Sequence, residues 1–297
     1  MAAPIGPTET ARITLGGRLH ELGDGLQVRR LLPGVRRRMV GPFVFFDHIG
    51  PAAFVPGSGL DVRPHPHIGL ATVTYLFAGS LRHRDSLGST QDIVPGDVNW
   101  MTAGRGIVHS ERTPPGARAS GQGLEGIQTW VALPAALAEC EPVFAHHDAA
   151  SLPAWQVEGA DLRLVAGSAY GRQSPVAVCS PLFEIACTLA ADAEVDLPGE
   201  HAERAVYVLA GEAEVAGMPV RAGELLVECG GAPGRMRARS AVTALLFGGA
   251  PYGPPPHLWW NFVAAEPSRI EQAKADWRAG RFGAVPGETE AIPLPGT

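Results

Sequence analysis

The sequence predicts an all-β protein made of two similar barrels. Helical periodicity is scarce, and 37 glycines and 27 prolines divide the chain into short apolar runs. Many short strands joined by turns are typical of a barrel or a sandwich. The segment Thr74–Gly79 is similar to Val206–Gly211, and related turns follow at Pro95–Asp97 in one half and Ala222–Glu224 in the other. An internal repeat of this kind predicts two copies of one barrel.

The apolar runs between the turns are the expected strands. They are rich in β-branched, aromatic and other apolar residues, and turn residues bound them. In chain order they are Gln27–Leu32, Phe43–Phe46, Leu70–Phe77, Gly126–Leu133, Leu162–Ala166, Leu182–Leu189, Ala205–Leu209, Leu225–Glu228 and Val242–Phe247.

Two segments break the strand pattern and are expected to be helical. The first, Ala135–Glu141, is short and lies between the repeats. The second runs over Glu266–Gly280, with Pro267 near its start and Gly280 as a stop signal. Its residues at helical spacing form one stripe, made of Ile270, Ala273, Lys274 and Trp277.

The boundary between the barrels is expected near residues 134–150, where Pro134, the short helix and Pro142 interrupt the strand pattern. We therefore expect an N-terminal domain at 1–140 and a C-terminal domain at 141–297 that includes the terminal helix and tail. A chain of 297 residues is long enough for two domains that each bury a core.

The composition describes a folded protein without a nucleic-acid footprint. Hydrophobic residues make up 45% of the chain and charged residues 18%, which argues against disorder. The net charge of −6 gives no basic face for nucleic acid, so we expect no direct nucleic-acid partner. A monomer is the expected state of a two-barrel protein.

The cysteines and the hydropathy pattern predict a cytoplasmic location. Cys140, Cys179, Cys187 and Cys229 are scattered without a Cys-x-x-Cys spacing, which indicates reduced thiols and not a disulfide framework or a zinc site. No apolar run of 18 residues occurs and the first residues do not resemble a signal peptide. We therefore expect no membrane partner.

Two short motifs predict a metal site in the first repeat. His65 and His67 are two residues apart, as are His109 and Glu111. The two-residue period of a β-strand places both side chains of each pair on one face of a sheet. Two strands could therefore direct four ligands at one point. The structural alternative is an exposed His-Pro-His turn and a hydrogen-bonded core histidine at 109.

The ligand types indicate a divalent transition metal. Three imidazoles and one carboxylate suit such an ion better than calcium or magnesium, which prefer an all-oxygen shell. Iron, manganese, nickel, cobalt, copper and zinc all remain open at this point. An octahedral ion would keep two positions free for water, oxygen or a chelating substrate.

The second repeat is expected to lack the metal. Aligning Gly79 with Gly211 sets Leu197 and Gly199 opposite His65 and His67, and aligning Gly96 with Gly223 sets Met236 and Ala238 opposite His109 and Glu111. His201 has no partner at ligand spacing and is interpreted as a surface or pocket residue. His83 and Asp85 follow Gly79 and either contact the ligands or face solvent.

Several blocks of the chain resemble pirin, a bicupin family. The similarity covers about residues 27–285, strongly in the first half and weakly between 145 and 250. The blocks that carry it are Pro64–Tyr75, Asp97–Glu111, Gly126–Val131, Asn261–Val263, the helix over Ile270–Trp277 and Arg278–Gly283.

The resemblance implies two jelly-roll-like cupin barrels, with iron, Fe(2+), bound in the N-terminal one by the residues matching His65, His67, His109 and Glu111. Cupins generally have a glutamate three or four residues after His-x-His, where this chain has Ala71 and Thr72. Glu111 supplies the carboxylate instead, which is the pirin arrangement.

The resemblance also implies a quercetin 2,3-dioxygenase activity, in which a flavonol reacts with O2 and carbon monoxide is released. Glu111 would take the proton of the flavonol hydroxyl. A carboxylate bound to a cation is a poor base, so this role requires Glu111 to bind the metal weakly or to detach. Another enolisable small molecule is a further possible substrate.

The rival interpretation is a non-enzymatic regulator. The resemblance implies that an iron-dependent redox sensor could bind a transcription factor or a metabolic enzyme. Oxidation would raise the summed charge of the metal and its ligands and could bias a nearby loop. A roomy apolar cavity above the metal would favour the enzyme, and a closed site beside an exposed patch would favour the regulator.

Overall fold

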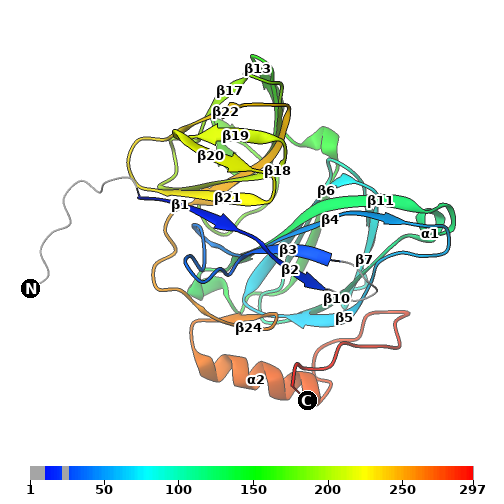
Figure 1. The fold of residues 1–297 in the computed structure, drawn as a ribbon. Helices are drawn as coiled ribbons and strands as arrows, with labels where there is room; N and C mark the ends of the chain where they lie inside the picture. Colours follow the sequence, from blue (N-terminus) through cyan, green and yellow to red (C-terminus); the bar gives the residue numbers. More distant parts are fainter. Residues whose placement is uncertain (1–10, 22–26, 297) are drawn as a thin grey trace, which may run out of the picture. The chain divides into compact units, whose positions relative to one another are not determined.

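The computed structural model describes residues 11–21 and 27–296 of the chain, and it consists mainly of antiparallel strands (Figure 1). Every strand expected from the sequence is present, and Gln27–Leu32 and Leu182–Leu189 have the expected bounds. The all-β fold with two similar barrels is therefore confirmed. Among the helices of the described residues, none is long and apolar enough to cross a membrane.

The first barrel consists of two antiparallel sheets. The larger has the order β12-β9-β6-β11-β4-β3-β2, and the smaller has the order β5-β10-β7-β8. The strands of the larger sheet are β2 (Arg18–Glu21), β3 (Gln27–Leu32), β4 (Phe43–Phe54), β6 (Leu70–Ala78), β9 (Val98–Thr102), β11 (Gln122–Ala132) and β12 (Val143–His147). Those of the smaller are β5 (Asp61–His67), β7 (Leu81–Asp85), β8 (Thr90–Ile93) and β10 (Ile107–Arg112).

The second barrel repeats this arrangement. Its larger sheet has the order β1-β21-β18-β23-β16-β14-β13, with β15 paired to β14, and its smaller sheet has the order β17-β22-β19-β20. The strands are β1 (Ala11–Gly16), β13 (Ala154–Val157), β14 (Ala160–Ala169), β15 (Arg172–Gln173), β16 (Leu182–Leu189), β17 (Glu194–Asp196), β18 (Glu203–Ala210), β19 (Glu212–Val215), β20 (Met218–Arg221), β21 (Glu224–Cys229), β22 (Arg235–Ala238) and β23 (Val242–Gly249).

The described residues form two compact units, and each is built from separate stretches of the chain. One unit contains 11–18, 31–43 and 150–253, and the other contains the described residues of 19–30 together with 44–149 and 254–296. The expected division into 1–140 and 141–297 places the two ends of the chain differently. That division stays a prediction about which segments fold independently.

The terminal segment belongs to the unit that holds the first barrel. It contains β24 (His257–Trp259), β25 (Phe262–Ala264) and α2 (Pro267–Arg278), which confirms the helix expected at Glu266–Gly280. Phe262, Ile270 and Ala273 of this segment pack against Ile68 in one buried cluster. The helix is amphipathic, and that packing is what holds it on the barrel.

The inter-repeat helix is shorter than expected. Ala135–Leu137 is a single 3-10 turn, η1, and the rest of the expected helix Ala135–Glu141 is irregular. The carbonyl of Cys140 accepts the amide of Arg105, and Pro142 follows within two residues, so an α-helical hydrogen-bond ladder cannot continue there. The remaining short helices are α1 (Pro115–Ser120) and η2 (Ala149–Ser151).

One strand, β6, links the apolar core of the first barrel to its polar end. Leu76 is fully buried and belongs to a core cluster with Leu81 and Leu124. Thr74 lies two residues earlier, so the strand period puts its side chain on the same face as Leu76. The Thr74 hydroxyl donates to Glu111. The predicted metal residues therefore lie inside the barrel, beyond its apolar core.

Candidate metal centre

Three of the predicted ligands come together between β5 and β10. The strands pair in antiparallel register with His65 opposite His109 and His67 opposite Ile107. One ring nitrogen from each of His65, His67 and His109 lies within 4.8 Å of the others. The side chains are buried, with 7%, 1% and 1% of their residues' surface exposed. Strand alternation and register thus deliver the three imidazoles to one point, as the two motifs predicted.

The imidazole nitrogens fit a metal ion. Both ring nitrogens of His67 and Nε2 of His109 are buried and have no partner within hydrogen-bond geometry among the described residues, although the Asn261 backbone lies close enough to His67 to favour its charged form slightly. A buried polar atom without a partner costs free energy unless a ligand satisfies it. Neutral imidazole nitrogens are good ligands for divalent transition metals. The donor set therefore matches the kind of ion expected from the sequence.

Burial keeps these rings neutral. It lowers the pKa of His65, and it lowers the pKa of His67 and His109 well below the ordinary value of 6.5, with repulsion from the neighbouring imidazoles adding to the effect. A neutral imidazole has a lone pair to offer, whereas an imidazolium has none. The metal-binding form is therefore the form that the barrel favours at neutral pH.

Glu111 is held beside the imidazoles by two side chains. The Gln128 amide donates to both carboxylate oxygens, at 3.0 Å and 3.0 Å, and the Thr74 hydroxyl donates to Oε1 at 3.4 Å. A bulge shifts the register of β10 against β5 between His109 and Glu111. Among the described residues, the group of mutually close ligand atoms that contains these three histidines does not include Glu111. Its role as fourth ligand stays a prediction.

His83 contacts His109, Asp85 contacts His83, and neither residue faces solvent. Nδ1 of His83 lies 3.3 Å from Nδ1 of His109, and Nε2 of His83 lies 2.9 Å from Oδ2 of Asp85. The two residues are 4% and 0% exposed. Burial alone would raise the pKa of Asp85, but hydrogen bonds from His83 and from the Ser89 amide outweigh it and lower that pKa. Asp85 therefore favours its ionised form.

An aromatic wall closes another side of the site. The Trp130 ring meets His67 edge-on, with centroids 5.1 Å apart, and Phe45 stacks on Trp130 at 3.8 Å. The guanidinium of Arg30 lies over the Phe45 ring, 4.4 Å from its centroid. Sequence reasoning did not assign Gln128 or Trp130 to the site. Their spacing of two within a predicted strand was the available signal, because it puts both on one face.

The smaller sheet of the second barrel has apolar residues where the first has its polar group. Met236 pairs with Val195 and Val215, as His109 pairs with His65 and Asp85. The amide of Leu197 bonds to the carbonyl of Gly234, two residues before Met236, which is the place of His67. The expected match of Leu197 with His65 and Gly199 with His67 is therefore wrong by two residues, because the loop between β17 and β18 is longer than the loop between β5 and β6.

The complete set of replacements is apolar and buried. In the second barrel the residues that take the places of His65, His67, His83, Asp85, His109 and Glu111 are Val195, Leu197, Ala213, Val215, Met236 and Ala238. His201 is buried and not at the surface, with its Nε2 bonded to the carbonyl of Ser168 at 2.8 Å. None of the six replacement residues in the second barrel can ligate a divalent transition metal as a histidine or a carboxylate does. At these matched positions, therefore, only the first barrel has metal-ligating residues.

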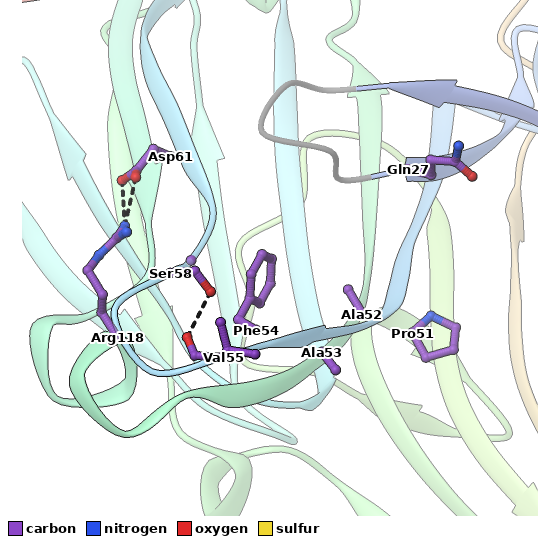
Figure 2. A pocket seen from close by; sticks show the side chains of 10 residues that line it. Gln27, Pro51, Ala52, Ala53, Phe54, Val55, Ser58, Asp61 and Arg118 are labelled. Atoms are coloured by element: carbon purple, nitrogen blue, oxygen red, sulfur yellow. Dashed lines mark hydrogen bonds and ion pairs between the residues drawn. The ribbon is translucent and has the colours of Figure 1, made fainter.

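Two cavities on the same unit are lined by residues other than the predicted ligands. One of about 700 Å³ is lined by Phe54 at the end of β4, by Val55 just after it, and by Asp61 and Arg118 (Figure 2). The ion pair of Arg118 with Asp61 forms part of its wall, at 2.8 Å. A second cavity of about 260 Å³ shares Asp61 and Arg118 and adds three further arginines. None of the four predicted ligands lines either cavity.

The chain matches known proteins along most of its length. A family model described as Pirin matches residues 25–131, and one described as Pirin C-terminal cupin domain matches residues 185–283. A pirin-like protein of Caulobacter vibrioides is 48% identical over 288 residues, covering 95% of this chain and 99% of its own.

Solved structures agree with those matches. A quercetin 2,3-dioxygenase of Acinetobacter baumannii is 35% identical, with a TM-score of 0.87 and 96% of each chain covered. A bacterial pirin of Escherichia coli in complex with nickel(II) is 18% identical, with a TM-score of 0.65, covering 81% of this chain and 100% of its own. At that identity the second match shows the fold alone.

Proposed function

Because the chain belongs to the pirin family, we propose that it is a metal-dependent dioxygenase that opens a flavonol such as quercetin with O2 and releases carbon monoxide. The observation that carries the proposal is the buried group of three imidazoles, two of which, His67 and His109, have ring nitrogens without a hydrogen-bond partner among the described residues. The A. baumannii structure named as a quercetin 2,3-dioxygenase, similar over 96% of both chains, supports it.

The proposed ligands are His65, His67, His109 and Glu111, and the proposed ion is Fe(2+). Three nitrogens and one oxygen also suit manganese, nickel, cobalt, copper or zinc. The nickel(II) named for the E. coli pirin is consistent with a site that accepts several such ions. When bound, the ion would supply a Lewis acid for the flavonol oxygens and the means of reacting with O2.

Glu111 is the proposed general base. Its two oxygens are held by Gln128, so the direction of the carboxylate does not depend on a metal ion. That support allows Glu111 to bind an ion weakly, which a base needs if it is to accept the proton of the flavonol 3-hydroxyl. Gln128 only donates to these oxygens through its amide nitrogen, so the proton would stay on Glu111.

The test is turnover of quercetin by purified protein loaded with Fe(2+) and exposed to air. We expect loss of the flavonol absorbance together with release of carbon monoxide. Glu111→Gln should lower the rate by about 10²–10⁴-fold, while Glu125→Gln, which contacts His48 elsewhere in the barrel, should not. Metal content measured on each variant separates loss of the base from loss of the ion.

One observation favours the second candidate function, a redox-sensing regulator that binds a transcription factor or a metabolic enzyme. The four predicted ligands are at most 8% exposed, and none of them lines the two cavities described above. A closed site suits a sensor better than a catalyst with a large substrate. Fully metal-loaded protein that leaves quercetin unchanged under air would overturn the dioxygenase and favour the regulator.

A further inference from the structure

We propose that Asp85, acting through His83, sets the tautomer of His109 and so presents the Nε2 lone pair of that ring to a metal ion. Asp85 and His83 are then positioning residues, not ligands. The inference rests on the proposed metal-binding function. It does not depend on which reaction the site performs.

The proton positions follow from the contacts of Asp85, whose Oδ1 accepts two backbone amides and whose Oδ2 faces His83. A carboxylate only accepts hydrogen bonds, so the hydrogen between Asp85 Oδ2 and His83 Nε2, 2.9 Å apart, belongs to His83. A neutral imidazole with its hydrogen on Nε2 has a lone pair on Nδ1. Nδ1 of His109, 3.3 Å away, must therefore donate to it. His109 then carries its hydrogen on Nδ1, and its Nε2 is free.

The free nitrogen is the one that lies among the ligands. Nε2 of His109 is buried and has no partner among the described residues, whereas Nδ1 contacts His83. His65 reaches the same tautomer by a simpler route, because its Nδ1 lies 2.8 Å from the carbonyl of Arg63, which can only accept. His109 differs in relying on two side chains, so a single substitution can reverse it.

Local contacts fix the orientation of the Asp85 and His83 side chains. Oδ1 of Asp85 accepts the amides of Leu87 and Ser89 at 2.9 Å and 3.0 Å, which leaves Oδ2 to face His83. The His83 ring stacks on Phe144 with centroids 4.1 Å apart and an angle of 8° between the planes. Both groups are thus held before an ion arrives, as metal sites require of the partners that orient a ligating histidine.

The second barrel shows that the scaffold does not need this pair. Ala213 and Val215 stand where the first barrel has His83 and Asp85, and Met236 stands in place of His109. The same sheet order forms around them. A buried carboxylate and imidazole are costly compared with apolar side chains, so their presence at these positions in the barrel with the ligands, and their replacement by apolar residues in the other, points to a role at the metal site.

The decisive variant is Asp85→Asn, which keeps the shape of the side chain. Its oxygen can still accept the Leu87 and Ser89 amides, but its NH2 group would then face His83 Nε2 and force that nitrogen to accept. His83 would donate from Nδ1, and His109 would have to carry its hydrogen on Nε2, where an ion should bind. Asp92→Asn is the control, because Asp92 pairs with Arg82 on the neighbouring strand and touches none of these groups.

Two measurements test the inference. Long-range ¹H–¹⁵N NMR of histidine-labelled, metal-free protein reports each tautomer, and His109→Gln identifies the His109 signals. We expect hydrogen on Nδ1 of His109 in the wild type and on Nε2 in Asp85→Asn. Chelator competition should show binding of nickel(II) weakened about 10–100-fold in Asp85→Asn and unchanged in Asp92→Asn.

Three results would overturn the inference: hydrogen on Nε2 of His109 in the wild type, a doubly protonated His83 there, or no change of the His109 tautomer in Asp85→Asn. The wild-type spectrum is decisive even if the variant does not fold. Since neither measurement uses quercetin, a protein without dioxygenase activity could still confirm the tautomer, and the two failures stay distinguishable.

Discussion

At the level of single residues, the site depends on histidines that are easier to bury neutral than charged. His67 is 1% exposed, and among the described residues its ring nitrogens have only a backbone contact with Asn261, outside hydrogen-bond geometry, so its charged form is penalised by lost hydration. The pKa of His67 is consequently well below 6.5. The same property that prepares the ring for a metal ion makes the metal-free protein sensitive to acid.

The first prediction concerns that sensitivity. Below pH 6.5 the unfolded chain binds a proton at residue 67 that the folded protein does not bind, so the free energy of unfolding falls as the pH decreases. His67→Gln removes this contribution. We therefore expect urea denaturation of the metal-free proteins between pH 7 and 5.5 to show that the free energy of unfolding falls more steeply in the wild type than in His67→Gln. The difference should reach up to about 1.4 kcal/mol per pH unit. Parallel curves for the two proteins would contradict it.

Gln128 illustrates a residue whose importance is only visible in three dimensions. It lies 17 positions from Glu111, and its amide donates to both oxygens of that carboxylate. A glutamine in a strand is ordinarily a surface residue, and only its spacing from Trp130 placed it on the inner face. The carboxylate that accepts hydrogen bonds from Gln128 could not be predicted, because several carboxylates lie in strands with the same two-residue alternation.

At the level of elements, the C-terminal tail braces the two strands that carry the ligands. Ser110 and Arg112 alternate with His109 and Glu111 along β10, and both donate to the carboxylate of Glu288, at 3.0 Å and 2.6 Å for the shortest contacts. The amide of Ile292 donates to the carbonyl of Pro64, next to His65. The tail thus bonds to the outer side of the strands whose inner side holds the imidazoles.

Close backbone approach gives the same segment a second attachment. Gly69 has φ of +68°, and a Cβ at that position would collide with the carbonyl of Val263 in β25. Glycine is therefore required both for the backbone conformation and for the space. The amide of Val263 donates to the carbonyl of Ile68, which is next to His67. The terminal segment fixes β5 just beyond its last ligand.

The prediction at this scale is that Glu288→Gln lowers the free energy of unfolding, because it weakens the contact between the tail and β10. Hydrogen bonds from Arg112 lower the pKa of Glu288 below 4.5, so the stability it contributes is present above that pH and is lost as the pH falls through the folded-state pKa. At pH 7 the substitution should cost about 1–3 kcal/mol. Chemical denaturation measures this cost, and the difference from the wild type should shrink toward pH 3.

Glu290→Gln is the matched control, because Glu290 is exposed two residues further along the tail. It should leave the unfolding free energy unchanged at both pH values. Equal effects of the two substitutions, or a Glu288→Gln effect that persists undiminished at pH 3, would show that the contact with Arg112 does not stabilise the strands.

At the scale of the whole molecule, one barrel architecture occurs twice and carries the polar group once. The order β5-β10-β7-β8 matches β17-β22-β19-β20 strand for strand. Barrel closure is therefore independent of the ligands, and metal binding is an added property of the first copy. The second copy fills the same interior with residues such as Met236 and Val215.

The whole-molecule prediction is that metal stabilises the two copies unequally. Saturation with nickel(II) at 100 times the dissociation constant should add about 2.7 kcal/mol to the stability of the unit that binds it. Hydrogen exchange should slow in β5, β7 and β10 and remain unchanged in β17, β19 and β22. Equal slowing of both sets, or none in the first, would contradict a single site in the first barrel.

The sequence by itself determined the strands, the repeat and the three imidazoles. These depend on spacing within a few residues: a period of two sets the face of a strand, and Gly and Pro set its ends. The resemblance to pirins in the blocks around Pro64–Tyr75 and Asp97–Glu111 added the bicupin fold, which the structure and the comparisons confirm.

Only the tertiary structure decided what surrounds those imidazoles. His83 bonds to His109 across 26 positions and Glu288 to Ser110 across 178, so both contacts depend on strand register and on the path of the tail. The two-residue error in aligning Leu197 has the same origin, because loop lengths shift a register without altering local periodicity. Local spacing selects a residue's face, but only the folded chain selects its neighbour, and Asp85 acts on the site through its neighbours.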